Sequence, residues 1–167
     1  MNERVRITPI SRGDESEFLA AALRSAMLHR PWVMPPTSRK AFRDKIQRMQ
    51  GPDNYAFCVR RVDSGDLVGY VEISNVVRGV FRSAYLGYYA FAGHERQGFM
   101  KEGLLQVIRL AFTQLRLHRL EANIQPDNAA SVALVRSLGF SREGFSPRYL
   151  KIRGRWRDHE RWARVAR

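Results

Sequence analysis

The residues with the clearest chemical potential form a polar turn at positions 95–100, with the sequence ERQGFM. The turn follows an aromatic segment at 85–89 and contains a single glycine, Gly98. Backbone N–H groups at a helix start are unpaired and lie at the positive end of the helix dipole, and glycine lets a phosphate approach them closely. The sequence therefore predicts a phosphate-binding turn. A helix is expected directly after it, because apolar residues recur at helical spacing at Met100, Leu104, Ile108, Ala111, Phe112 and Leu115.

The common nucleotide-binding loops do not match this turn. Gly98 and Gly103 have the glycine spacing of a Walker loop, but Leu104 stands where that loop requires lysine. The chain also lacks a G-x-G-x-x-G sequence with an acidic residue about 20 positions later, the signature of dinucleotide-binding folds. The phosphate is therefore expected to belong to another kind of ligand.

The turn resembles the R/Q-x-x-G-x-G/A pyrophosphate loop of the GNAT superfamily of N-acetyltransferases, with Glu95 replacing the first residue and Met100 the last. A block at 128–144 is similar to the family's N-x-x-S…L-G-F-x-x-E-G motif and follows at the family's spacing. The resemblance covers nearly the whole chain, from Val5 to Val165. Segments similar to the RimJ-type branch, the ribosomal-protein-alanine N-acetyltransferases, are residues 31–32, 74–79, 86–88 and 154–159.

This resemblance implies an α/β (α+β) fold with a single GNAT domain over residues 1–167. Its mixed central sheet would have about seven strands, splayed at the middle, with about four flanking helices. A chain of 167 residues is also of single-domain length. Alternating apolar residues and turn signals predict strands at 4–10, 55–62, 67–75, 82–91, 119–124, 149–152 and 156–165.

Polar residues at the start of apolar periodicity predict where the helices begin. Asp14 is expected to cap the first helix, Ser38 the second and Asn128 the fourth, while the third follows the phosphate turn. The buried face of the first helix is expected to contain Phe18, Leu19, Ala22, Leu23, Ala26 and Met27.

The resemblance also implies where acetyl-CoA binds. Leu86, Gly87 and Tyr88 would lie beside the thioester, where a backbone N–H polarises the acetyl carbonyl. A donor aimed at the developing oxyanion commonly contributes about 3–4 kcal/mol. Gly87 could instead be a packing glycine. The diphosphate would be held, mostly by backbone N–H groups, at Arg96, Gln97, Gly98, Phe99, Met100 and Lys101.

Asn128 and Ser131 carry the second half of the resemblance. Asn128 could be only an N-cap, worth about 1 kcal/mol, whereas the matching asparagine of the family also binds the pantetheine arm. Ser131 lies one turn later on the same face, and the resemblance places it near the sulfur of CoA. Many relatives use a tyrosine four residues further on, but this chain has Val135 there. The role of general acid is therefore assigned to Ser131, with a plain helix residue as the alternative.

The general base has no obvious counterpart. Some relatives have a carboxylate before the residue matching Tyr149, where this chain has Arg148. Glu72 on the third strand and a water relay remain, and Glu72 could equally be an exposed strand residue. The expected catalytic residues are therefore Ser131, Tyr88 and Glu72. The acceptor groove is expected to include Trp32, Asn75 and Tyr149, with Trp32 as a packing residue in the alternative interpretation.

Composition limits the remaining chemistry. The single cysteine, Cys58, lies in an apolar strand and is expected to be a packing residue in a reducing compartment. The four histidines lack paired metal spacing, so no metal is predicted. The N-terminus has no apolar targeting segment and no stretch is long enough to span a bilayer, so a cytoplasmic protein is expected. The net charge of +13 predicts attraction for anions, for which acetyl-CoA accounts in part. The rest of the charge indicates an acidic or nucleic-acid-bearing partner, or simply an organism with basic proteins.

The sequence therefore favours an acetyl-CoA-dependent N-acetyltransferase, without a metal, that acts on a protein N-terminal α-amine by direct attack in a ternary complex. A ribosomal protein is the favoured acceptor, and the positive charge would then hold the enzyme near ribosomal RNA. The first alternative is a small amine, such as a polyamine or an aminoglycoside antibiotic. The second is a ribosome- or RNA-associated binding protein with weak catalysis. The natural acceptor and the oligomeric state stay open at this stage.

Overall fold

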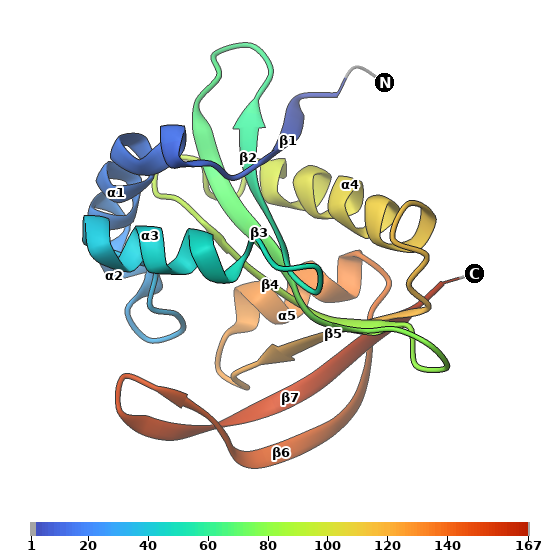
Figure 1. Ribbon diagram of the computed structural model, residues 1–167. Coiled ribbons are helices and arrows are strands. Elements are labelled where there is room, and N and C mark those ends of the chain that lie inside the picture. The colour runs from blue at the N-terminus through green and yellow to red at the C-terminus, as the bar shows by residue number, and fades with distance from the viewer. Residues whose placement is uncertain (1–2, 167) are drawn as a thin grey trace.

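The computed structural model describes residues 3–166 and contains one seven-stranded mixed sheet with helices on both faces (Figure 1). The strand order is β1-β2-β3-β4-β5-β7-β6, and only β4 and β5 are parallel neighbours. The predicted mixed sheet is confirmed. The strands are β1 (Val5–Pro9), β2 (Tyr55–Arg61), β3 (Leu67–Val77), β4 (Ser83–Ala90), β5 (Arg119–Ile124), β6 (Ser141–Ile152) and β7 (Arg155–Val165).

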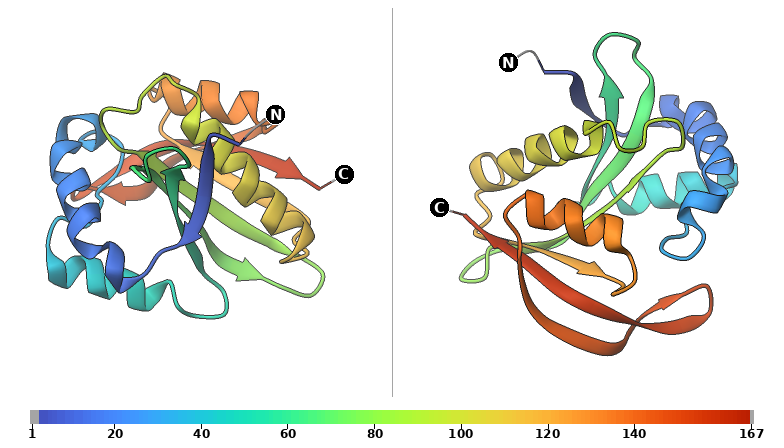
Figure 2. Two further views of the ribbon diagram at one scale, coloured as in Figure 1. Left: turned by 90° about the horizontal axis from the view of Figure 1, so that it is seen from above. Right: turned by 180° about the vertical axis from the view of Figure 1, so that it is seen from behind.

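Two groups of helices sandwich this sheet. Helices α1 to α3 lie on one face, and α4 and α5 cover the other (Figure 2). A short 3-10 turn at Arg12–Asp14 precedes the first group. The described residues form five α-helices where about four were expected. The helices are α1 (Glu15–Arg24), α2 (Ala26–His29), α3 (Arg39–Arg48), α4 (Phe99–Thr113) and α5 (Ala129–Ser137).

The additional helix arises because the first predicted helix is interrupted at Ser25. The buried Ser25 hydroxyl donates to the carbonyl of Ala21 at 2.6 Å and accepts from the backbone N–H of Ala92 at 2.8 Å. A side chain bonded to the preceding turn competes with the helical ladder and commonly bends a helix. The expected buried face was partly wrong as a result, because Leu23 and Met27 are 60% and 81% exposed. The exposed face also includes Ala26, while Ala21, Ser25 and His29 are buried.

Two of the three predicted helix caps are confirmed. Ser38 and Asn128 each accept a hydrogen bond at 3.2 Å from the backbone N–H three residues later. Asp14 precedes α1 but its carboxylate does not cap it. That carboxylate instead accepts from the backbone N–H of Ser11 at 2.8 Å and from Arg60 at 2.7 Å. Asp14 therefore joins the 3-10 turn to β2.

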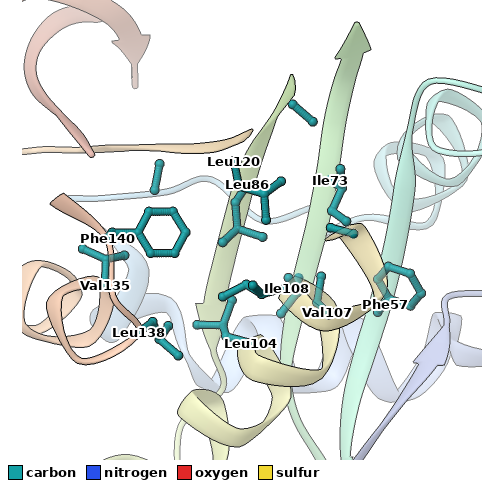
Figure 3. Close-up of a cluster of buried hydrophobic side chains, with 14 of the residues drawn as sticks. Phe57, Ile73, Leu86, Leu104, Val107, Ile108, Leu120, Val135, Leu138 and Phe140 are labelled. Carbon is teal, nitrogen blue, oxygen red and sulfur yellow. The ribbon is translucent and has the colours of Figure 1, made fainter. Parts of the chain in front are cut away.

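The main core lies between the sheet and helices α4 and α5 (Figure 3). Leu104 and Ile108 of α4 pack there with Leu86 of β4, and each is at most 4% exposed. Gly103 has a packing role, because a Cβ there would lie 2.7 Å from the side chain of Val59. Gly103, which has the spacing of the second glycine of a Walker loop, therefore allows α4 to lie close to β2. A second core, around Phe18, Phe42 and Tyr70, lies under α1 and α3.

The sheet opens between β4 and β5. These strands pair only where Ser83–Tyr85 meet Arg119–Glu121, and beyond that point they diverge. On its other side β5 continues to pair with β7 along its whole length. The expected splay is therefore present, and it leaves a gap at the centre of the sheet.

The last hairpin is longer than predicted. The strand expected at 149–152 extends back to Ser141, and the β6–β7 register shifts twice, between Arg142 and Gly144 and between Ser146 and Leu150. Pro147 lies inside the second irregular segment, and proline cannot donate to a strand ladder. These interruptions removed the regular alternation on which the strand prediction depended.

Candidate active site

Two adjoining cavities lie where β4 and β5 diverge. The larger, of about 1040 Å³, is bounded by the loop after α2, the end of β4, the start of α4 and one face of α5. The smaller, of about 120 Å³, lies in the gap itself, between residues 86–88 of β4 and residues 122–125 at the end of β5. The residues that line both cavities are Trp32, Val33, Tyr88, Asn128 and Ser131.

The predicted phosphate turn forms one end of the larger cavity. Gly98 caps α4 with a left-handed backbone (φ 81°), and no side chain caps this helix start. Arg96 is also left-handed (φ 59°), so the turn presents the first N–H groups of a 15-residue helix. Gln97, predicted as part of the diphosphate cradle, does not line the cavity, and its side chain donates to the carbonyl of Gly93 at 3.3 Å. The predicted turn residues that line the cavity are Arg96, Gly98, Phe99, Met100 and Lys101.

Arg4 anchors this turn to the first strand. Its guanidinium donates to the carbonyl oxygen of Gln97 at 3.0 Å and forms an ion pair with Glu102, with a distance of 2.7 Å from Nε to the carboxylate. Its Cζ lies 4.9 Å from the centre of the Phe99 ring. Residues nearly one hundred positions apart in sequence thus hold the turn, and nothing in the local sequence pattern indicated the contact.

Tyr88 and Ser131 face each other on the wall common to both cavities. Their hydroxyl oxygens are 2.6 Å apart, and the Asn128 cap fixes the first turn of α5, on which Ser131 lies. Burial raises the pKa of Tyr88 to about 12, so this phenol keeps its proton at neutral pH. Val135, which stands where many relatives have a tyrosine, is fully buried in the core. Tyr88 brings a tyrosine hydroxyl to this wall from a strand instead of from the helix.

Leu86 and Gly87 line the smaller cavity, but Glu72 lines neither. The Glu72 carboxylate accepts from Lys45 and from the Tyr70 hydroxyl, each at 2.7 Å. Gly87 accommodates it closely, because a Cβ at that position would lie 3.1 Å from Cγ of Glu72. The structure therefore supports a packing role for Gly87 and places the predicted base on the face of the sheet covered by α1 and α3.

The three predicted acceptor residues have different environments. Trp32 lines both cavities, and Gln125 holds its loop by donating to the carbonyl oxygens of Pro31 and Trp32 at 3.1 and 3.3 Å. Asn75 lines neither cavity and lies exposed at an irregularity of β3, with φ 52°. Tyr149 also lines neither, but its ring centre is 6.2 Å from that of a buried histidine, His159, which lines the smaller cavity.

Four lining residues that were not predicted carry an unusual feature. Within residues 3–166, every buried side-chain N or O atom without a hydrogen-bond partner belongs to a residue lining one of the cavities. Such atoms are costly in a folded protein and commonly pair with a ligand or water. Three of the four residues line the larger cavity, and Asn123 lines the smaller one. The atoms are Nδ1 of His29, the Tyr89 hydroxyl, Nδ1 of His94 and Oδ1 of Asn123.

Several other chemistries find no support in the described part of the chain. Cys58 is fully buried, and desolvation raises the pKa of its thiol to about 12, which agrees with the predicted packing role. In residues 3–166 no three His, Cys, Asp or Glu side chains are grouped as they would be around a metal ion. No helix formed by these residues has the length and apolar character needed to cross a membrane.

Comparisons with known proteins agree on one family. The family model described as "Acetyltransferase (GNAT) domain" matches residues 4–141. The probable N-acetyltransferase YjcK of Bacillus subtilis is 32% identical over 122 residues, which are 73% of this chain and 67% of that protein. The [ribosomal protein uS5]-alanine N-acetyltransferase of Escherichia coli is 41% identical over 97 residues, 58% of this chain and only half the length of that enzyme.

Two further comparisons cover nearly the whole chain. The spermidine N(1)-acetyltransferase of Vibrio cholerae is 24% identical over 165 residues, which are 96% of this chain and 92% of that enzyme. The solved structure of Mycobacterium smegmatis RimJ in complex with CoA-disulfide has a TM-score of 0.89 at 27% identity and covers 97% of this chain and 82% of that one.

Proposed function

The chain belongs to the GNAT acetyltransferase family, and we propose that it transfers the acetyl group of acetyl-CoA to the N-terminal α-amine of a protein, by direct attack in a ternary complex. One observation carries the proposal. The larger cavity runs from the N-terminus of α4 to the Tyr88–Ser131 pair and there meets the gap between β4 and β5. A helix N-terminus suited to an anion, a largely apolar channel and the gap in the sheet are thus continuous.

Acetyl-CoA fits the larger cavity by its chemistry. The backbone N–H groups at the start of α4 suit a diphosphate, because they are directed out of the helix at its positive end. Asn128 and His29, which both line the cavity, suit the amide groups of a pantetheine arm. The same cavity has mostly small or apolar residues on α5, which suits the aliphatic parts of that arm.

The Tyr88–Ser131 pair would assist departure of CoA. A thiolate leaving in an enclosed site needs a proton or strong hydrogen bonds. Ser131 can donate to the sulfur while Tyr88 donates to Ser131, because Tyr88 stays protonated at neutral pH. The backbone around Gly87 would hold the oxyanion, since β4 groups that face the gap beyond Tyr85 have no partner on β5.

Electrostatics at the entrance favours a peptide over a polyamine. The loop that carries Trp32 is joined to the tip of the β6–β7 hairpin, because Arg153 donates to the carbonyl of Arg30 at 2.6 Å (Figure 1). Within the described residues, Arg30, Arg153 and Arg155 form no ion pair with a carboxylate. This basic rim repels a polycation and suits an N-terminus followed by acidic residues.

An α-amine is also the easier nucleophile for a site without a strong carboxylate base. At pH 7 about one-tenth of an α-amine is neutral, against roughly 1 in 2,500 of a lysine side chain, given pKa values of ~7.7–8.0 and ~10.4. The name of the E. coli relative, an alanine N-acetyltransferase of ribosomal protein uS5, supports an alanine terminus of a ribosomal protein as the acceptor.

Acetylation of a polyamine is the second candidate, favoured by the spermidine N(1)-acetyltransferase that aligns with 96% of the chain. A thiol-release assay with acetyl-CoA separates the two. Peptides that begin with alanine or serine should be acetylated with a kcat/KM about 100-fold or more above that of spermidine or an aminoglycoside. A single unfavourable charge contact costs a few kcal/mol, which corresponds to a ratio of this size. The same peptides with a blocked N-terminus serve as the matched control. Turnover of spermidine alone would overturn the N-terminal assignment, and no thiol release with any amine would overturn acetyl transfer.

A further inference from the structure

His159 of β7 lines the small cavity in the gap between β4 and β5, and it is 3% exposed. Its Nδ1 lies 2.9 Å from the backbone carbonyl oxygen of Arg157. A carbonyl oxygen only accepts hydrogen bonds, so this contact assigns the proton to Nδ1. In the neutral ring Nε2 then has no hydrogen and is the atom that can accept one.

The register of the strands places this ring on the side of the gap opposite the CoA site. Along β5, Ala122 and Ile124 belong to the core under α4 and α5, whereas Asn123 alternates to the other face. Asn123 pairs with Arg161 of β7, and His159 shares the face of Arg161 because it lies two residues away. A thioester reaching the gap from the α4–α5 side and an amine entering from the other side would therefore meet between Ser131 and His159.

The groups around the ring leave His159 as the best-placed base. Desolvation lowers the pKa of His159 and outweighs the opposite contributions of the Arg157 carbonyl and Asp158. The ring is therefore neutral at pH 7. Tyr149 of β6 packs against it, and the nearby Tyr149 raises the pKa of Tyr85 of β4. The other charged or titratable groups near this side of the gap are Glu121 of β5, Arg161 of β7, Glu72 of β3, whose carboxylate is paired with Lys45, and Tyr88 in the gap itself.

We propose that Nε2 of His159 is the general base that takes the proton from the acceptor amine. This inference rests on the proposed acetyl transfer. The amine nitrogen forms a bond to the acetyl carbon and passes one proton to Nε2, and the carbon–sulfur bond then breaks. The departing thiolate takes a proton from the Ser131–Tyr88 pair. The imidazolium and the hydroxyl pair return to their starting states by proton exchange with water, so the net products are the amide and CoA thiol.

The test separates the base from the structural hydrogen bond. His159→Asn keeps a side-chain N–H in the position of Nδ1, whereas His159→Gln keeps a polar group in the position of Nε2, and neither can act as a base. Each should lower kcat about 100-fold or more, the usual contribution of general base catalysis. The dissociation constant of acetyl-CoA should change less than about threefold. A tenfold change would correspond to a loss of about 1.4 kcal/mol of binding free energy. His118→Asn, the same substitution at an exposed histidine outside both cavities, is the matched control.

The pH dependence supplies a readout that does not depend on a variant folding. With a peptide acceptor, kcat of the unaltered protein should fall as pH decreases below about 6.5, because protonation of the histidine removes the base. A kcat that is flat from pH 7 to pH 5 would overturn the assignment. So would a His159→Asn protein with kcat within threefold of the unaltered protein, or a 100-fold loss in Glu72→Gln alone. None of these three results would argue against acetyl transfer by this protein. If the unaltered protein acetylated no amine, the proposed function itself would be refuted.

Discussion

The hydroxyl of Tyr88 on β4 lies 2.6 Å from the hydroxyl of Ser131 in the first turn of α5. This contact joins a strand of the sheet to the helix opposite, on a wall that the two cavities share. It also explains how the chain can lack a tyrosine at position 135, where Val135 is buried in the core. The pair supplies two hydroxyl groups to the point at which a thiolate would leave.

Ser131→Ala and Tyr88→Phe should each lower kcat for peptide acetylation, by about tenfold to a hundredfold, since each removes one donor to the developing thiolate. The double variant should be little worse than the worse single one, because residues of one proton relay are not additive. Steady-state kinetics of the three variants measures this. Losses that multiply in the double variant would show that the two hydroxyls act separately.

Gly98→Ala should weaken acetyl-CoA binding about tenfold, because a side chain at φ 81° is strained and its Cβ would lie 3.2 Å from Nη2 of Arg4, the residue that anchors the turn. Calorimetric titration with acetyl-CoA measures the change. Gly79→Ala is the control, since Gly79 has φ 67° with nothing within 4 Å of its Cβ. Both variants should lose about 1 kcal/mol of unfolding free energy. Equal effects on acetyl-CoA binding would contradict a role of the turn.

Asn128→Ala and Ser38→Ala remove caps of the same geometry from two helices, since each residue accepts at 3.2 Å from the N–H three residues later. Each should cost about 1 kcal/mol in the free energy of unfolding, measured by urea denaturation. Only Asn128→Ala should also raise the KM for acetyl-CoA, because Asn128 lines both cavities and Ser38 lines neither. An unchanged KM in Asn128→Ala would show that Asn128 only caps α5 and does not bind acetyl-CoA.

The melting temperature should fall as pH decreases from 6.5 to 5, because burial lowers the pKa values of His29 and His159 in the folded protein. The unfolded chain then binds protons first, near pH 6.5, so acid favours unfolding in this window and the histidines contribute fully above it. Tm measured across this window should depend less on pH in the double variant His29→Gln/His159→Asn. An unchanged slope would mean that neither ring is neutral in the fold.

Features that depend on neighbouring residues in the chain were predicted better than contacts between residues that are distant in sequence. Gly98 and Asn128 were found because a helix start needs a local signal, and both begin helices. The support of the turn by Arg4 was missed, since it depends on the packing of α4 against β1. Glu72 was chosen by its strand position, and only the structure shows its pairing with Lys45.

His159 was missed for a different reason. The sequence around it was recognised as part of the GNAT resemblance, but the histidine was weighed only as a metal ligand. Its proposed role rests on burial and on the pairing of β5 with β7, which only the structure shows. Association with ribosomal RNA stays a prediction, because a net charge of +13 indicates attraction for anions without selecting one.

A crystal structure with bound CoA tests the central claim most directly. We expect the diphosphate within hydrogen-bond distance of the backbone N–H groups that follow Gly98, the pantetheine arm beside Asn128, and the sulfur next to the Ser131 hydroxyl at the mouth of the gap between β4 and β5. A diphosphate bound away from the start of α4, or a sulfur outside the gap, would contradict it.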